Sequence, residues 1–189
     1  MISDILLALI PFSDDELEDI LSHFEKELIP KNQVLVKEGQ VCNKLYFVEK
    51  GIGRSYYLKN DGKEVTQWFF GIGSVMSSVD SFFQQSPSIY YLEILEDSIV
   101  YSITKEEMDV LLAKYHKMET LARLLSIEML TKVIQKLNAV QFQTAKERYD
   151  YMLTEYPDIS HQVPLGHIAS YLGMTQETLS RIRRSELPR

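Results

Sequence analysis

The segment Leu165–Arg184, LGHIASYLGMTQETLSRIRR, constrains the fold of this chain more than any other stretch. Its apolar residues are spaced so that two short helices, joined by a tight turn, share one small core. We expect the first helix to end at Leu172, Gly173 to supply the backbone freedom for the turn, and Thr175 to cap the second helix. Ala169 permits a close approach of the two helices. The predicted core residues are Ile168, Leu172, Met174, Leu179 and Ile182.

The exposed face of the second predicted helix carries side chains that hydrogen-bond to bases and phosphates. These residues are Gln176, Glu177, Ser180, Arg181 and Arg184. The cap also leaves the N-terminus of this helix free to face a phosphate. The simpler alternative is an ordinary pair of antiparallel helices that closes a domain. Spacing, turn glycine, cap and side-chain types agree with one another, so the pattern favours a helix-turn-helix that binds DNA.

Charge is distributed unevenly along the chain, whose formal net charge is −7. Residues 163–189 contain four arginines, the last of them Arg189, against two glutamates. This local balance of +2 leaves −9 on the other 162 residues. Such asymmetry predicts one small basic face on an acidic body, with a modest and salt-sensitive affinity for DNA per subunit. It favours a dimer over a monomer.

The 189 residues suffice for one large or two small domains. No stretch is long and apolar enough to cross a membrane, and the N-terminal sequence MISDILLALIPF lacks the basic flank of a signal peptide, so we expect a soluble cytoplasmic protein. Cys42 is the single cysteine, which excludes an internal disulfide, a cysteine-ligated iron–sulfur cluster and a cysteine-ligated zinc site. We expect no cofactor and no metal.

Most of the first half of the chain alternates between apolar and polar residues in short runs. Ser13 and Glu16 form a capping box that should start a helix reaching about Phe24. Asn60-Asp61-Gly62, between two of the later runs, is a hairpin signal. Thr104 should cap a helix that begins at Lys105. The runs are VLVKEG (34–39), KLYFVEKG (44–51), GRSYYL (53–58), EVTQWFF (64–70), YYLEIL (90–95) and SIVYSI (98–103), and they predict a compact antiparallel barrel or roll.

The segment from Met118 to Phe142 is apolar around most of its helical circumference, with a narrow polar strip. A helix that packed only against its own domain would show one apolar arc. This helix would need two partners, and we expect them to be the roll and the same helix of a second subunit. The alternative is a helix sandwiched inside a large domain. Another helix should run from Thr144 to Tyr156, where Pro157 stops it.

The predicted roll, long helix and terminal helix-turn-helix follow one another along the chain. In this order of elements the chain resembles the CRP/FNR family of bacterial transcription regulators over nearly its whole length. The most specific local match is TQETLSR, residues 175–181. The resemblance implies that Gln176, Glu177 and Arg181 reach base edges; chemically, these side chains suit adenine, cytosine and guanine, respectively. The remaining contacts, to phosphates, are assigned to Thr175, Thr178, Ser180 and Arg184.

The resemblance implies an α+β fold: an N-terminal antiparallel β-roll of the jelly-roll (double-stranded β-helix) type with flanking helices, then a long dimerisation helix, then the helix-turn-helix. We expect a cyclic-nucleotide-binding-like roll over residues 1–115, the dimerisation helix over 116–142 and the DNA-binding domain over 143–189. Relatives usually continue into a β-hairpin wing. This chain stops at Arg189, so we expect no full wing and a lower non-specific affinity.

The pocket of the roll departs from the family members that bind cyclic AMP. Those members carry a Gly-Glu pair that holds a ribose hydroxyl and an Arg-Ser pair that neutralises the phosphate. With the chains aligned through Gly73, these positions fall on Ser77-Ser78 and Pro87-Ser88, so both the acid and the cation are missing. The hydroxyls of Ser77, Ser78 and Ser88, with Tyr90, Tyr91 and Trp68 nearby, can either line a pocket for a less charged ligand or fill a closed roll. Cyclic AMP is not expected.

The sequence argues against two rival functions. Small β-rolls host metal-dependent enzymes that collect two or three histidines, but no histidine occurs between His23 and His116, so we expect no enzyme. A cyclic-nucleotide- or small-ligand-binding signalling module without DNA binding would keep the phosphate site and lack the terminal motif. We therefore expect a homodimeric transcription regulator. Its partners would be a palindromic double-stranded DNA operator, a second copy of itself, RNA polymerase and an unknown small-molecule effector or none, with no membrane partner.

Overall fold

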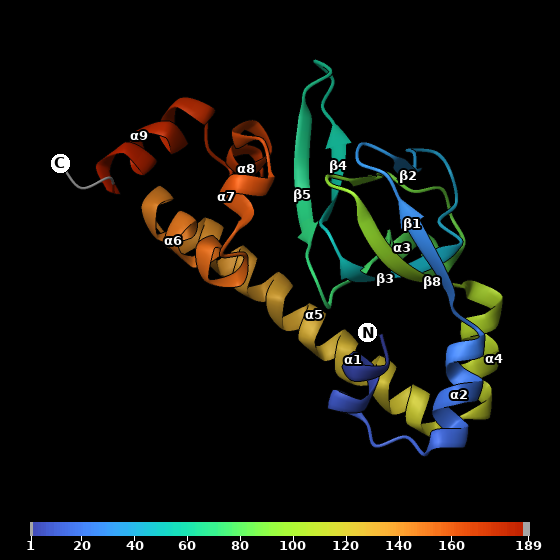
Figure 1. Cartoon of the computed structure of the whole chain (residues 1–189). Coiled ribbons are helices and arrows are strands. Elements are labelled where there is room, and N and C mark those ends of the chain that lie inside the picture. Colours follow the sequence, from blue (N-terminus) through green and yellow to red (C-terminus); the bar gives the residue numbers. More distant parts are fainter. Residues whose placement is uncertain (1, 187–189) are drawn as a thin grey trace. The chain divides into compact units, whose positions relative to one another are not determined.

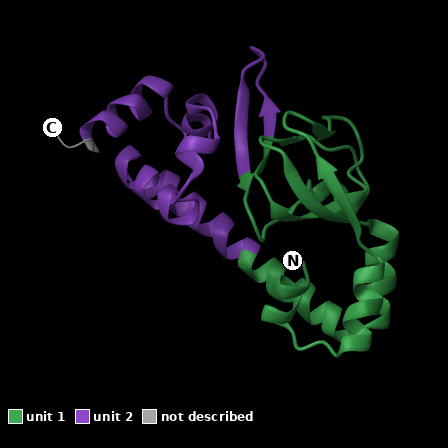
Figure 2. Cartoon of the chain, viewed as in Figure 1, with its two compact units in different colours: residues 1–55, 69–128 green, residues 56–68, 129–189 purple. Residues whose placement is uncertain are grey.

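The computed structural model describes residues 2–186, with the side chain of Glu186 left undescribed. Arg189 lies outside these residues, so the expected absence of a wing and part of the basic charge balance fall on the undescribed part. Contacts group the chain into two units (Figure 2). Unit 1 consists of residues up to 55 and residues 69–128, and unit 2 consists of residues 56–68 and those from 129 onward. The boundaries expected at 115 and 142 stay a prediction.

The strands form a roll of two four-stranded sheets within the described residues, as the alternating runs predict (Figure 1). One sheet has the order β1-β8-β3-β6 and the other β2-β7-β4-β5. In the first sheet, β8 pairs antiparallel with both β1 and β3, and Ser102 lies opposite Glu25 on one side and Tyr46 on the other. The strands are β1 (Glu25–Ile29), β2 (Val34–Val36), β3 (Lys44–Lys50), β4 (Gly53–Leu58), β5 (Glu64–Phe70), β6 (Val75–Met76), β7 (Tyr91–Ile94) and β8 (Ser98–Thr104).

Alternation along the strands builds the core of unit 1. Leu92 and Ile94 on β7 are fully buried, whereas the residues between and before them are half-buried, so one face of this strand points inward. Other fully buried apolar residues include Val48, Phe69, Met76, Phe82, Val100 and Ile103. Two strands escaped the sequence prediction. β1 carries the polar run Glu25–Glu27 on largely exposed positions, and β6 has only two residues, so neither shows a strand-like apolar pattern.

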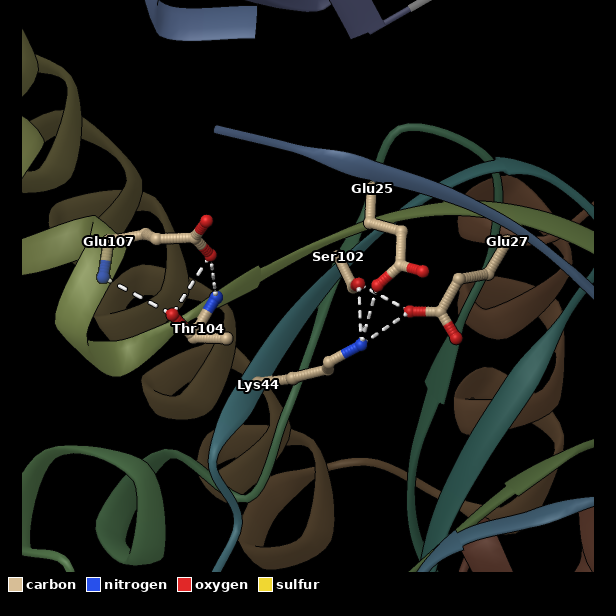
Figure 3. A network of polar contacts seen from close by, with 6 residues as sticks. All are labelled: Glu25, Glu27, Lys44, Ser102, Thr104 and Glu107. Carbon is tan, nitrogen blue, oxygen red and sulfur yellow. Dashed lines mark hydrogen bonds and ion pairs between the residues drawn. The ribbon is translucent and has the colours of Figure 1, made fainter. Parts of the chain in front are cut away.

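Two helices of unit 1 begin at the predicted caps. Ser13 starts α2 (Asp14–Ser22) and Thr104 starts α4 (Lys105–Lys114), and in both the glutamate three residues later completes a capping box. The Thr104 hydroxyl accepts from the Glu107 N–H at 3.2 Å, and the Glu107 carboxylate accepts from the Thr104 N–H at 3.2 Å (Figure 3). Unit 1 also contains α1 (Ile2–Leu9), which was not predicted, and α3 (Val79–Gln84).

A polar network links β1 and β3 across β8 in the first sheet (Figure 3). The Lys44 ammonium on β3 donates to Glu25 at 3.1 Å and Glu27 at 3.0 Å, both on β1, and to Ser102 at 3.2 Å on the intervening β8. Ser102 also donates to Glu27. Burial lowers the pKa of Lys44, but the hydrogen bonds and charges of Glu27 and Glu25 outweigh it and raise the pKa overall. The network holds β1 against the sheet although its sequence is a weak strand former.

Unit 2 contains the tip of the β4–β5 hairpin, the second half of the long helix and the terminal helices. The hairpin signal is confirmed: Gly62 has φ = 79°, and the Lys59 N–H donates to the Lys63 carbonyl at 2.9 Å. The long helix is also confirmed, as α5 (His116–Phe142). The helix predicted from Thr144 to Tyr156 is present as α6 (Ala145–Glu155), and Thr144 caps it. The chain then forms α7 (Ile159–Gln162), which was not predicted, α8 (Leu165–Tyr171) and α9 (Gln176–Glu186).

Large apolar side chains remain exposed on α5. Ile127, Leu130, Ile134 and Leu137 are separated by three, four and three residues, which is the spacing of the inward positions of a coiled coil. Val133 and Val140 are exposed beside them. None of the helices in residues 2–186 has the length and apolar character needed to span a membrane.

Candidate functional site

The segment Leu165–Arg184 forms the predicted helix-turn-helix. Leu172 is the C-cap of α8, and Gly173 follows in the left-handed region with φ = 66°. The Met174 N–H then reaches back to the Ala169 carbonyl at 3.0 Å, which closes the turn. Thr175 begins the second helix, because its hydroxyl accepts from the Thr178 N–H at 3.2 Å.

Apolar side chains from both helices make the core of this motif. Ile168, Ala169 and Leu172 from the first helix and Leu179 from the second are all buried. Ala169, with only a methyl side chain, is buried as expected for a close approach of the helices. Because this small core sets the direction of α9, the side chains on the opposite face of α9 are held in a defined arrangement.

The seven predicted DNA contacts all lie on α9 or its cap. Thr175, Gln176, Glu177, Arg181 and Arg184 are exposed, whereas Thr178 and Ser180 are half-buried. Arg181 donates from Nη2 to the Thr178 hydroxyl at 3.3 Å, and that hydroxyl lies 3.2 Å from the hydroxyl of Thr175. Five of them, Gln176, Glu177, Ser180, Arg181 and Arg184, are spaced so that they share one face of α9, whereas Thr178 lies off that face and Thr175 is the cap. Their individual roles toward DNA stay a prediction.

Glu177 is held in its ionised form. A hydrogen bond from its own backbone N–H, then the Thr175 hydroxyl and then the charge of Arg181 lower the pKa of its carboxyl group. A carboxylate that stays ionised is a hydrogen-bond acceptor only, and this suits the amino group of a cytosine.

Arg148 on α6 fixes the position of the turn, and sequence reasoning missed it. Its Nε donates to the Leu172 carbonyl at the end of α8 at 2.9 Å, and its Nη1 donates to the Gln143 carbonyl at 2.8 Å. Gln143 directly follows α5. The guanidinium thus joins the end of the long helix to the turn of the DNA-binding motif. No local sequence pattern marks Arg148, because both of its partners are backbone carbonyls.

The three serines proposed as ligand contacts in the roll are buried and bonded within the protein. Ser88 donates to the Ser78 hydroxyl at 2.8 Å and lies 2.9 Å from the Tyr90 carbonyl, while Ser78 donates to Asp80 at 3.0 Å. Ser77 lies 3.3 Å from the Lys44 carbonyl. A ligand would have to replace these hydrogen bonds, so the geometry fits the closed-roll alternative better than an open pocket. Ligand binding by Ser77, Ser78 and Ser88 stays a prediction.

Cys42 belongs to the same buried cluster. Its Sγ lies 3.3 Å from the Ser77 hydroxyl, and its backbone N–H donates to the Ser81 hydroxyl at 2.9 Å. The side chain is fully buried, as befits a small residue filling the core. Trp68, which was expected near the serines, belongs to unit 2 and lines a cavity there.

The roll does contain a buried cation and an acid, but they pair with each other. Arg54 on β4 is 2% exposed, and its Nη2 and Nε lie 2.6 and 2.8 Å from the same carboxylate oxygen of Glu93 on β7. β4 and β7 are neighbouring strands, so the pair is a cross-strand ion pair. Sequence reasoning placed no cation in the roll, because the run GRSYYL shows only an apolar strand pattern around Arg54.

Comparison with known proteins gives consistent results. Residues 26–115 match the cyclic nucleotide-binding domain family. The chain is 28% identical over 179 residues to an anaerobic regulatory protein of Haemophilus influenzae, covering 89% of this chain and 68% of that protein. It is also 28% identical over 179 residues to a fumarate and nitrate reduction regulatory protein of Vibrio cholerae, with 89% and 70% covered. The match thus spans about two thirds of the length of these relatives.

Solved structures share the fold. FixK2 from Bradyrhizobium japonicum superposes with a TM-score of 0.74 at 19% identity, covering 86% of this chain and 83% of that one. The catabolite activator protein of Thermus thermophilus superposes with a TM-score of 0.60 at 20% identity, covering 96% and 85%.

A cyclic-nucleotide-binding-type roll followed by a long helix and a helix-turn-helix defines a class of regulator in which a sensor-type domain and an output motif share one chain. Within that class, the matches to the roll family and to the two regulatory proteins agree with the motif found at residues 175–181. In the order of its roll, long helix and helix-turn-helix, and in these matches, the chain is similar to the CRP/FNR family of transcription regulators.

Proposed function

We propose that this protein is a cytoplasmic, homodimeric transcription regulator that binds a palindromic double-stranded DNA operator through α9. The observation that carries the proposal is the exposed face with Gln176, Glu177 and Arg181 on a helix braced by a buried core. An exposed helix at the end of a helix-turn-helix fits the major groove, and its N-terminal residues then meet the base edges.

The side chains divide into two sets. Arg181 reads a guanine, Glu177 a cytosine and Gln176 an adenine, because their donors and acceptors match those base edges. Thr175, Thr178, Ser180 and Arg184 contact phosphates and set the register of the helix without reading sequence.

Dimerisation uses the exposed stripe of α5. Ile127, Leu130, Ile134 and Leu137 form the seam, and the two copies lie parallel so that both recognition helices face the same side of the DNA. Two helices then enter successive major grooves, about one helical turn apart. Each subunit adds its modest affinity to that of its partner, which compensates for the small basic face.

The same proposal includes contact with RNA polymerase bound at the promoter beside the operator. Transcription in vitro from a template carrying the selected operator tests this contact. A change in transcript yield that depends on both protein and operator supports it, and an identical yield with and without protein contradicts it.

The test of DNA binding starts with selection of duplexes from a random library by the full chain at low salt. Arg181→Ala should relax the preference at one base position per half-site and weaken binding to the selected site by roughly 10- to 100-fold. Arg123→Ala, on an exposed part of α5, is the matched control and should leave affinity unchanged. Absence of salt-dependent binding to any duplex would overturn the proposal in favour of a signalling module without DNA binding.

A further inference from the structure

Unit 2 contains a cavity that the proposed DNA contacts do not use. Its walls come from Trp68 on β5, from the second half of α5, from α6 and from Tyr171 and Leu172 at the end of α8. Its volume is about 40 Å³. That is room for about three water molecules, and so for a solute of roughly three to five non-hydrogen atoms.

Lys136 on α5 points its amino group into an aromatic setting at this cavity. Nζ lies 3.9 Å from the ring centre of Tyr171 and 5.2 Å from that of Trp68, and it donates to the Gln67 carbonyl. Among the described side chains, those of residues 2–185, no carboxylate lies within ion-pair distance of this ammonium. Burial lowers its pKa to about 8, so the group still carries its charge at neutral pH. A desolvated cation of this kind gains from an anion beside it.

The charged residues around the cavity are predominantly cationic. Lys132, Lys136 and Arg148 line it, against Glu155 as the acid. Arg148 already donates to the carbonyls of Leu172 and Gln143, whereas the partners of Lys136 among the described residues are a carbonyl and two ring faces. A small anion entering the cavity therefore finds its best partner in Lys136.

The rest of the lining is largely apolar and aromatic. Ala139, Val140, Met152 and Leu172 supply alkyl groups, and Tyr151 and Tyr156 add two aromatic rings to those of Trp68 and Tyr171. An inorganic anion would lose hydration against these groups without compensation, whereas an alkyl group gains from contact with them. The cavity thus fits an anion with a short apolar end.

The geometry points to this cavity as a binding site for a short-chain monocarboxylate, with the carboxylate on the Lys136 ammonium and the alkyl end against Ala139 and Met152. This carboxylate is the effector of the regulator, an assignment that rests on the proposed DNA binding. The lining joins α5, α6 and the end of α8, so an occupant stabilises the junction through which Arg148 positions the turn. When a ligand has already ordered this junction, less conformational entropy is lost on binding DNA. The carboxylate should therefore raise the affinity for DNA.

Trp68 is the single tryptophan of the chain, so its fluorescence reports directly on the cavity. Acetate is titrated into the full chain from ~0.01 to ~50 mM against chloride at constant ionic strength, because a ligand of four heavy atoms binds at best in the tens of micromolar range. We expect a saturable change with acetate and none with its neutral isostere acetamide. Equal responses to acetate, acetamide and chloride would overturn the site.

Variants assign the response to Lys136. Lys136→Met keeps the alkyl stem and should raise the half-saturating acetate concentration at least tenfold, whereas Lys146→Met, at an exposed lysine of α6, should not. An unchanged response in Lys136→Met contradicts the proposal. If circular dichroism shows that Lys136→Met is unfolded, a labelling experiment on the wild-type chain replaces this variant. Lysines are acylated with an activated ester, and the labelled positions are mapped by mass spectrometry. Acetate should protect Lys136 at least threefold more than acetamide, and equal labelling refutes the site.

The affinity of the protein for the selected duplex is then measured in about 50 mM acetate and, separately, in about 50 mM chloride. This concentration is chosen to exceed the dissociation constant expected for acetate. Acetate should tighten binding at least about threefold in the wild type and leave Lys136→Met unchanged. A fluorescence response without any change in DNA affinity overturns the effector role. Failure to bind DNA at all refutes the proposed function, and the fluorescence titration still decides the carboxylate site.

Discussion

Leu130 offers a quantitative test of the proposed dimer. It is 59% exposed on α5, in the middle of the stripe made with Ile127, Ile134 and Leu137. Full burial of a leucine side chain contributes roughly 1.5 to 3 kcal/mol relative to the exposed state. Burying the exposed part against a second helix, and allowing for what alanine retains, gives about 1 kcal/mol for each Leu130, and so about 2 kcal/mol for the symmetric pair.

Leu130→Ala should therefore weaken the dimer about 30-fold, since 1.4 kcal/mol corresponds to tenfold. Leu137, 56% exposed and two helical turns further on, lies about 10 Å away along the axis. The two effects should add, and the double variant should dimerise about a thousandfold more weakly. Sedimentation velocity over a concentration series measures the dimer dissociation constant of each variant.

The control is Leu28→Ala on β1, where the leucine is 77% exposed but lies off the stripe. It should leave the dissociation constant unchanged, and circular dichroism should confirm that all variants keep their helix content. A change of less than about threefold in Leu130→Ala refutes the seam. So does an equal effect from Leu28→Ala, because both variants remove the same exposed apolar group.

Three further predictions follow from single contacts. Arg148→Met should destabilise unit 2 by about 1 to 2 kcal/mol, because charged hydrogen bonds to two carbonyls are lost. It should also speed hydrogen exchange at the Gly173 amide. Unchanged exchange would contradict the role of Arg148 in positioning the turn. Thr104→Ala should cost about 1 kcal/mol in urea unfolding through loss of the cap; a loss below about 0.3 kcal/mol would argue against it. The hydrogen bonds from Thr104 lower the pKa of Glu107 below its ordinary 4.5, so this contribution is present above pH 4.5 and is lost as the pH falls through the lowered value. Finally, acetate affinity should fall as the pH rises through about 8, where Lys136 loses its proton, and a flat profile from pH 7 to 9.5 would rule out the ammonium as the anion partner.

Local sequence patterns predicted most elements of this fold because each depends on neighbouring residues. Thr104 caps α4 and Thr144 caps α6 through glutamates three residues later, and Gly62 permits the hairpin. Local patterns did not predict an element where pairing with a distant strand, and not the preference of its own residues, makes it form. β1 is a strand because its backbone pairs with β8 and because Lys44 binds its glutamates, and both partners are distant in sequence.

The residues expected to read DNA could be found from the sequence because they occupy one face of one helix. The sequence also predicted that the roll lacks the acid and the cation of a cyclic AMP pocket. It could not show how that region is filled. The buried pair of Arg54 and Glu93 and the hydrogen bond between Ser78 and Ser88 depend on strands meeting across the roll.

The sequence by itself determined the output motif: helix, turn glycine, cap and polar face follow one another within 20 residues, and their spacing suffices. Tertiary structure alone decided how that motif is held and what lies beside it. Arg148 acts through backbone carbonyls, which no residue pattern records. The cavity at Lys136 needs Trp68, Ala139 and Tyr171 from separate elements. Burial and desolvation, which give Lys136 its chemistry, arise only when these elements pack together.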